Sequence, residues 1–195
     1  GTSSAFAQTM SVGATPQGGN VLESAFDAPL GTTFDLVVTL DTGGDPSSAA
    51  EFVMTELLLI APGVFKLNTT KINSTQLDLG DNSLGEYLMA FGACVANPQV
   101  EMVRVNYGNF QGAPAADTVI SLRGFEAGDT QPSSFEGALG FIDCADNAIV
   151  AQFGGTDGGV TGSGVVFPDG SCVLNPTPIA VPTADGTVGQ LKARF

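Results

Sequence analysis

Short runs of apolar and β-branched residues alternate with clusters of glycine, proline, asparagine and aspartate along nearly the whole chain. In residues 34–40 and 100–107 apolar and polar side chains alternate, and turn-forming residues follow the first run at 41–46. No stretch has the spacing of a convincing amphipathic helix, although residues 49–54 alone could begin one. The pattern predicts an all-β fold, a single antiparallel β-sandwich of the Ig-like, jelly-roll type. The predicted strands lie at residues 34–40, 52–60, 77–79, 87–91, 100–107, 119–122 and 148–153.

The chain has 195 residues, of which 43% are apolar and 13% are charged, so it is long and apolar enough to bury one core. No apolar run approaches the roughly 18 residues of a membrane-spanning helix, and we expect no membrane insertion. The glycine-rich stretch 154–164 is expected to be a loop. We expect three parts, which are an extended N-terminal segment at 1–15, the sandwich at 16–175, and a proline-rich connector with a basic tail at 176–195.

Charge and the missing histidine exclude several kinds of function. Twenty acidic and six basic residues give a net charge of -14, which argues against nucleic acid and anionic membranes as partners. Without histidine the chain cannot form a Ser-His-Asp triad, a Cys-His pair or a histidine-ligated metal site. We therefore expect a protein that is not an enzyme.

Several features are typical of secretion to the cell surface or medium. Residues 3–8 resemble the small-residue end of a signal peptide, with cleavage expected after Ala7, although the resemblance could be accidental. Asn68 and Asn73 each begin an Asn-x-Thr/Ser triplet and are candidate glycosylation sites. A secreted or cell-surface location is the resulting prediction.

Three cysteines allow one disulfide and leave one thiol. A Cys94–Cys144 bond would close the larger part of the core, and Cys144–Cys172 is its competitor. In the first case Cys172 is free, either buried or bridging to another subunit. In an oxidising compartment one bond is expected to contribute about 2–4 kcal/mol.

Acidic residues in turns suggest oxygen ligands for a metal, and calcium is the one cofactor that we consider. Asp143 and Asp146 flank Cys144 and are the candidate ligands, although aspartate is also simply a good turn residue. A paired-carboxylate hydrolase is a weaker reading, because the chain has no tryptophan and only two tyrosines to serve as sugar platforms.

The two ends of the sequence suggest contacts between copies. The N-terminal segment is apolar with partial alternation, so it can be the chain's own first strand or can add to a neighbour's sheet edge. Two of the six basic residues lie in the last four positions, where they could dock on the acidic body of another copy. The candidate assembly residues are Phe6, Met10, Val12, Leu191, Lys192, Arg194 and Phe195.

Residues 184–195 resemble the closing signature of a group of uncharacterised secreted bacterial proteins, which typically end in Thr/Ser-Trp-Gly-x-x-Lys-Ala-x-Tyr. Val188 replaces the tryptophan and Phe195 the tyrosine, and the resemblance extends to residues 114–117, 132–135 and Cys144. This group implies no activity. The strand layout, with an early threonine-rich strand and a long apolar one ending in Pro-Gly-Val, also resembles a cohesin-type sandwich by fold-level analogy.

These observations predict a secreted structural or interaction protein. Its most concrete form is a subunit of an extracellular filament or surface assembly, in which copies of the chain join by exchanging terminal strands. The alternative is a monomeric cohesin-like module that binds protein or carbohydrate and is stabilised by calcium.

Overall fold

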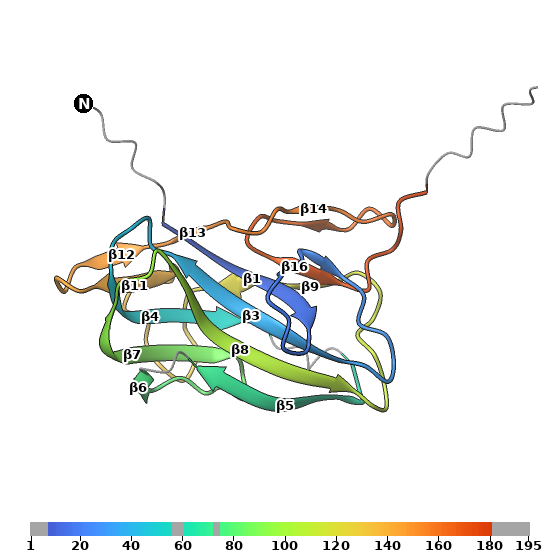
Figure 1. The fold of residues 1–195 in the computed structure, drawn as a ribbon, viewed down its shortest axis with the longest axis horizontal. Helices are drawn as coiled ribbons and strands as arrows, with labels where there is room; N and C mark the ends of the chain where they lie inside the picture. The colour runs from blue at the N-terminus through green and yellow to red at the C-terminus, as the bar shows by residue number, and fades with distance from the viewer. Residues whose placement is uncertain (1–7, 56–60, 72–74, 181–195) are drawn as a thin grey trace, which may run out of the picture.

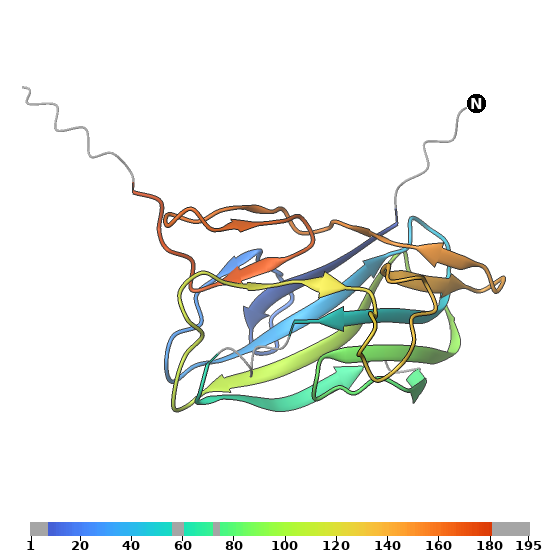
Figure 2. The ribbon, with the colours of Figure 1, turned by 180° about the vertical axis from the view of Figure 1, so that it is seen from behind.

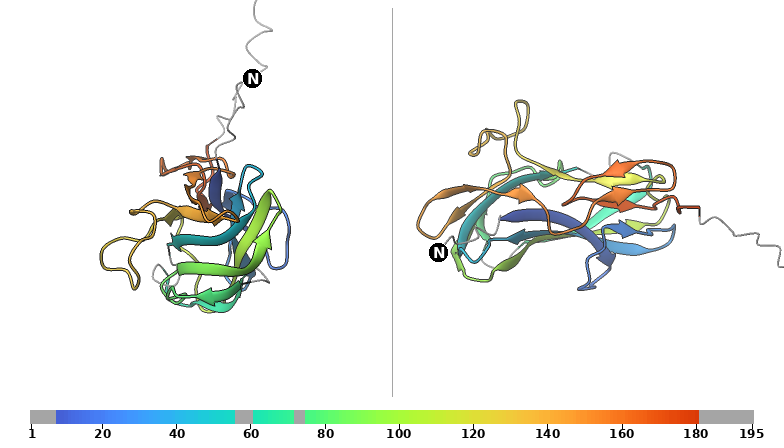
Figure 3. Two further views of the ribbon diagram at one scale, coloured as in Figure 1. Left: turned by 90° about the vertical axis from the view of Figure 1, so that its left-hand side faces the viewer. Right: turned by 90° about the horizontal axis from the view of Figure 1, so that it is seen from above.

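The computed structural model describes residues 8–55, 61–71 and 75–180, and this part of the chain contains strands and no helix. Two large sheets lie in two layers, as the end-on view of Figure 3 shows, and the all-β prediction is confirmed. The first sheet has the order β13-β1-β3-β8-β5 (Figure 1). Its strands are β1 (Thr9–Pro16), β3 (Thr33–Asp41), β5 (Val64–Lys71), β8 (Gln99–Asn109) and β13 (Gln152–Phe153).

The second sheet has the order β12-β11-β4-β7-β6, with β10 (Leu122–Arg123) paired beside β11 on β4. Two small sheets, β2-β16-β9 and β14-β15, lie at one end of the molecule (Figure 1). The strands of the second sheet are β4 (Ser47–Met54), β6 (Thr75–Asp78), β7 (Glu86–Val95), β11 (Gly140–Asp143) and β12 (Ala148–Val150). Those of the small sheets are β2 (Ala25–Phe26), β9 (Thr118–Ile120), β14 (Gly159–Val160), β15 (Val166–Phe167) and β16 (Cys172–Leu174).

The core lies between the inner faces of the two large sheets, where alternate side chains of each strand are buried. Phe34 stacks on Tyr107 within the first sheet at 5.6 Å between ring centroids, and Phe52 stacks on Tyr87 within the second at 5.1 Å. Nearly all strand pairs are antiparallel. The exceptions are β1 with β13 and β16 with β2, which run parallel.

Strand β1 belongs to the body of the sandwich. It pairs with β3 from Thr9 to Pro16, and its alternation buries Met10 and Val12 completely. Its other edge is closed by β13 and by backbone hydrogen bonds to Glu23 and Gly170. The sequence boundary at residue 15 therefore falls inside a strand, and the described part of residues 1–15 is the chain's own first strand.

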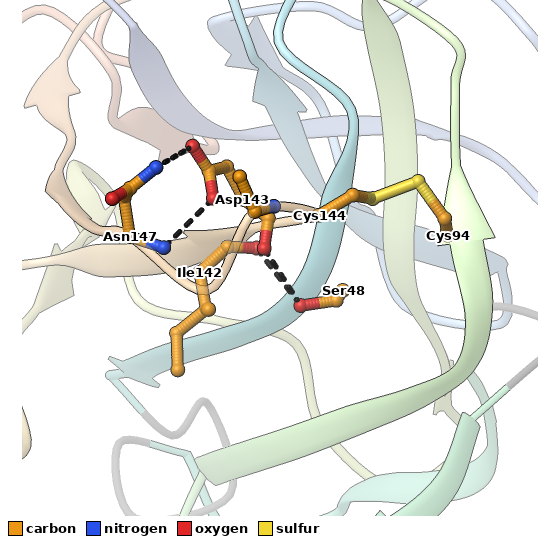
Figure 4. Close-up of a disulfide and its surroundings, with 7 residues drawn as sticks. Ser48, Cys94, Ile142, Asp143, Cys144 and Asn147 are labelled. Atoms are coloured by element: carbon orange, nitrogen blue, oxygen red, sulfur yellow. Dashed lines mark hydrogen bonds between the residues drawn. A yellow bond between two sulfur atoms is a disulfide. The ribbon is translucent and has the colours of Figure 1, made fainter.

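The Cys94–Cys144 disulfide joins the end of β7 to the residue that follows β11, as predicted (Figure 4). Strand β4 lies between these two strands, and Ser48 near its start donates hydrogen bonds to the carbonyls of Ile142 and Asp143. The disulfide and the Ser48 hydrogen bonds together fasten three neighbouring strands at one end of the sheet. Cys172 is free and buried in β16, and burial raises the pKa of its thiol to about 12.

Candidate functional site on the open face of the five-stranded sheet

The outer face of the five-stranded sheet carries a buried ion-pair network. Asp35 on β3 accepts hydrogen bonds from Arg104 Nη1 and Asn106 Nδ2, both on β8 and both at 2.8 Å. Arg104 also donates two 2.8 Å bonds to Glu101 through Nε and Nη2. The bonds to Glu101 are the largest cause of a raised pKa of Arg104, and the bond to Asp35 raises it further. The guanidinium is thus held from two sides by carboxylates.

The same network holds the loop at residues 17–24 against this face. Gly18 N–H donates to Asp35 at 2.8 Å, and Arg104 donates to the carbonyl of Gly19 at 3.1 Å. A Cβ placed on Gly13 of β1 would lie only 2.8 Å from Leu22 Cβ, so the loop passes directly over the strand at a glycine. The loop forms a fixed wall at one side of the sheet.

A polar trough lies between this loop and the opposite edge of the sheet. It consists of two adjoining hollows of about 440 and 370 Å³, which share Gln99, Val100 and Glu101 on β8. Because Met10 and Leu40 point into the core, their strand neighbours point outward and line the first hollow. The polar residues that line the trough are Thr9, Ser11, Asn20, Thr39, Asp41, Thr70, Lys71, Asn97, Gln99, Glu101 and Arg104.

Residues of the glycine-rich stretch close one end of the trough. Gly155 has a φ of +98°, and a Cβ there would lie 3.0 Å from Ser11 Oγ. Ser11 in turn shares a 2.8 Å hydrogen bond with Thr39 across the β1–β3 pair. The stretch that the sequence marked only as a loop therefore approaches the sheet closely enough to require glycine.

An apolar patch lies at the other end of the same face, and we call it the aromatic patch: Phe65, Leu67 and Phe110. The rings of Phe65 and Phe110 stack with centroids 6.4 Å apart. Phe110 and Leu67 both cover Gly108, where an added Cβ would lie 2.4 Å from the ring and 3.1 Å from Leu67 Cδ1. The three side chains are 40–55% exposed, so a contiguous apolar surface faces solvent.

The outer face of the second sheet is covered in part by the chain itself, although Leu77 on β6 is 51% exposed. The loop at residues 124–139, which we call the strap, crosses in front of β4 and β7 (Figure 2). Two buried carboxylates hold it: Glu51 accepts bonds from Ser133 and Ser134, and Glu86 accepts bonds from Thr130. Beyond the 17–24 loop, no such strap crosses the outer face of the five-stranded sheet in the described part of the chain (Figure 1).

The structure gives Asp143 a role in its own turn. Its carboxylate accepts hydrogen bonds from Ala145 N–H and from the backbone and side-chain amides of Asn147, all at 2.8 Å, and the Asn147 bonds lower its pKa. Asp146 occupies the left-handed position of the turn with a φ of +62°. Among the described residues, no group of three or more acidic or cysteine side chains is arranged to hold a metal ion.

Of the other predicted residues, Asn68 is exposed on β5, with Nδ2 3.4 Å from Thr70 Oγ1 in the same triplet. Met10 and Val12 are buried in β1. The remaining candidates lie outside the described residues and stay predictions: Phe6, Asn73, Leu191, Lys192, Arg194 and Phe195. The same holds for the secreted-protein signature at 184–195.

Sequence reasoning missed the trough and the aromatic patch. The alternation of residues 100–107 places Arg104 and Asn106 on one outward face, and this signal was available. Glu101 joins them only because the β3–β8 pairing shifts register between Val38 and Thr39, which the sequence does not show. Nothing in the sequence shows that this face remains open or that Phe110 turns back over Gly108.

The described residues contain no helix that is long and apolar enough to span a membrane. No protein-family model matches the chain, and no curated protein matches its sequence. Two similar solved structures are cohesin modules. The one from a Clostridium perfringens ATCC13124 family 33 glycoside hydrolase is 12% identical over 74% of this chain and 92% of its own, with a TM-score of 0.43.

The other is the second type II cohesin module from the cellulosomal adaptor ScaA scaffoldin of Acetivibrio cellulolyticus. It is 13% identical over 89% of this chain and 99% of its own, with a TM-score of 0.42. A likeness at this level carries no argument about what this chain binds.

Proposed function

We propose that this chain is a non-catalytic binding module that recognises a partner protein through the outer face of the five-stranded sheet. The aromatic patch carries the proposal. Stacked, half-exposed aromatic side chains on an open and rigid face are the usual centre of a protein–protein contact. The polar trough on the same face supplies the hydrogen-bonding rim that such a contact has.

The arrangement supports protein recognition better than the other readings. Among the described residues no aromatic side chain lines the trough, so this part of the chain offers a sugar ring no platform there. Filament assembly by strand exchange stays a prediction, and exchange of the N-terminal strand would require Met10 and Val12 to leave positions where they are fully buried. The Cys94–Cys144 disulfide supports an oxidising, extracytoplasmic location.

The test uses random fragments of the source organism's proteome, displayed on phage and selected on the immobilised wild-type protein. The dissociation constants of purified selected fragments are then measured for the wild-type protein and for a variant with Phe65→Ser and Phe110→Ser. Because central aromatic residues contribute about 2 kcal/mol or more each, we expect at least about 100-fold weaker binding.

The control variant carries Val160→Ser and Val166→Ser. These valines are 52% and 70% exposed on the β14–β15 hairpin, away from the proposed surface, and their loss should leave binding unchanged. Thermal unfolding checks that both variants fold. Binding that survives the two phenylalanine substitutions, or that falls equally in the control, would overturn the proposal.

A further inference from the structure

We propose that the polar trough is a second binding site on this face and that it takes an extended segment of the partner bearing a lysine or arginine side chain. The proposal rests on the proposed function in that the segment belongs to a protein partner. It stands on different residues from the aromatic patch, so the two can fail separately.

The shape of the trough fits an extended chain. Its two hollows meet at Gln99–Glu101, so together they run from β1 across β3 and β8 to the end of β5 and to Val95 at the end of β7. A segment laid along this path would cross the strands instead of running parallel to them. It would meet the hydroxyl groups of Thr9, Ser11 and Thr39 and the carboxamide of Gln99, which can bond to peptide groups.

The walls of the trough are already in place. Arg104 and Asp35 pin the 17–24 loop on one side, and Gly155 lies against Ser11 on another. A ligand would therefore bind without first ordering a loop, which reduces the entropic cost of association.

Charge decides the class of side chain. Asp35 and Glu101 share a single guanidinium, that of Arg104, which donates through Nε and Nη2 to Glu101 and through Nη1 to Asp35 and the Gly19 carbonyl. Asp41 lines the same hollow as Glu101 and accepts a hydrogen bond from Gly43 N–H. Arg104 is thus committed to the protein, and the carboxylates leave an excess of negative charge in the first hollow. Lys71, in the second hollow, is paired with Asp78 at 2.6 Å.

The field of the whole molecule acts in the same direction. With a net charge of -14, the chain attracts cationic segments from a distance and repels anionic ones. A lysine or arginine side chain placed between Asp41 and Glu101 would meet the local excess, whereas a neutral sugar would gain nothing from it.

The experiment records amide chemical shifts of the ¹⁵N-labelled protein during titration with the peptide GSKSG, blocked at both ends. The matched probe is the same peptide with an acetylated lysine. We expect saturable shifts at Ser11, Thr39 and Gln99 with the free lysine, and at least about fivefold smaller shifts with the acetylated one. High salt should reduce the first set.

Two double variants of equal net charge separate a local site from general attraction. Asp41→Asn with Glu101→Gln should weaken lysine-peptide binding about three- to tenfold, as expected for two partly exposed ion pairs. Asp27→Asn with Glu126→Gln removes two exposed acids that do not line the trough and should leave binding unchanged.

Equal weakening in both double variants, equal binding of the acetylated peptide, or no shifts at the trough would overturn the inference. None of these outcomes touches the proposed function, which depends on Phe65 and Phe110. Conversely, the variant with both phenylalanines replaced should still bind the lysine peptide, because the aromatic patch lies at the other end of β5.

Discussion

The Asp35 carboxylate accepts three hydrogen bonds on a face of the sheet that otherwise meets solvent. Its partners are Gly18 N–H, Arg104 and Asn106, and the residue is only 2% exposed. One side chain therefore joins β3 and β8 to the 17–24 loop. Because that loop forms a wall of the trough, the stability of the fold and the shape of the site depend on the same residue.

Replacing Asp35 with alanine should lower the free energy of unfolding by about 2–4 kcal/mol, because the partly buried guanidinium of Arg104 and the side-chain amide of Asn106 lose their acceptor. Urea unfolding at neutral pH measures the loss. Asp27→Ala, at an exposed aspartate, should change stability by less than about 0.5 kcal/mol. A similar effect at the two positions would show that the Asp35 network contributes little.

Single residues also mark the limit of what the sequence predicts about the site. The sequence shows glycine at 108 and 155 but not the reason for it, which is in each case a close contact. Phe110 and Leu67 cover Gly108, and Ser11 lies against Gly155. Periodicity reports which side of a strand is apolar. It cannot report which loop folds over that strand.

Among the elements, strands with one strongly apolar face were predictable. Runs 34–40 and 100–107 lie within β3 and β8, whose alternate residues fill the core. Strand β5 was missed because it ends the sheet and carries mostly polar residues, among them Lys66 and Lys71. Charged residues of this kind are common on edge strands, where they discourage pairing with other chains.

The strap is a second element that local pattern could not predict. Its residues 132–135 were noted only for a resemblance, whereas in the structure Ser133 and Ser134 bond to Glu51 and the Phe135 ring covers Gly140. Besides Glu51 and Glu86, the strap is anchored by the pair of Arg123 with Asp129, at 2.6 and 2.8 Å. The hydrogen bonds from Arg123 lower the pKa of Asp129 to about 2.

This shift predicts how the strap responds to acid. The folded-state pKa of Asp129 lies below its ordinary value of 3.8, so its stabilising effect is present above about pH 4 and is lost as the pH falls toward 2. Asp129→Asn should therefore melt at a lower temperature than the wild type at pH 6, and the difference should vanish near pH 2. Melting temperatures across this range measure it, and a difference independent of pH would contradict the assignment.

At the scale of the whole molecule, the dominant quantity is net charge. The sequence total of -14 was enough to exclude nucleic acid and anionic membranes as partners. It could not locate the trough, because that requires knowing that Asp41 and Glu101 meet on one face while Arg104 is already paired. The total describes repulsion within the chain, and the proposed trough is one place where a cation would relieve it.

Self-repulsion on this scale should make the fold more stable in salt. Between about 10 mM and 1 M NaCl the Debye length falls from about 30 Å to about 3 Å, so repulsion among distant carboxylates is screened. We expect the melting temperature at pH 7 to rise by a few degrees, and the rise to shrink near pH 3, where carboxylates without strong hydrogen-bond donors are protonated. The same salt should weaken lysine-peptide binding at the trough, because there the interaction being screened is attractive. A melting temperature that falls with salt at pH 7 would mean that the ion pairs of Arg104, Arg123 and Lys71 outweigh the repulsion of the excess acids.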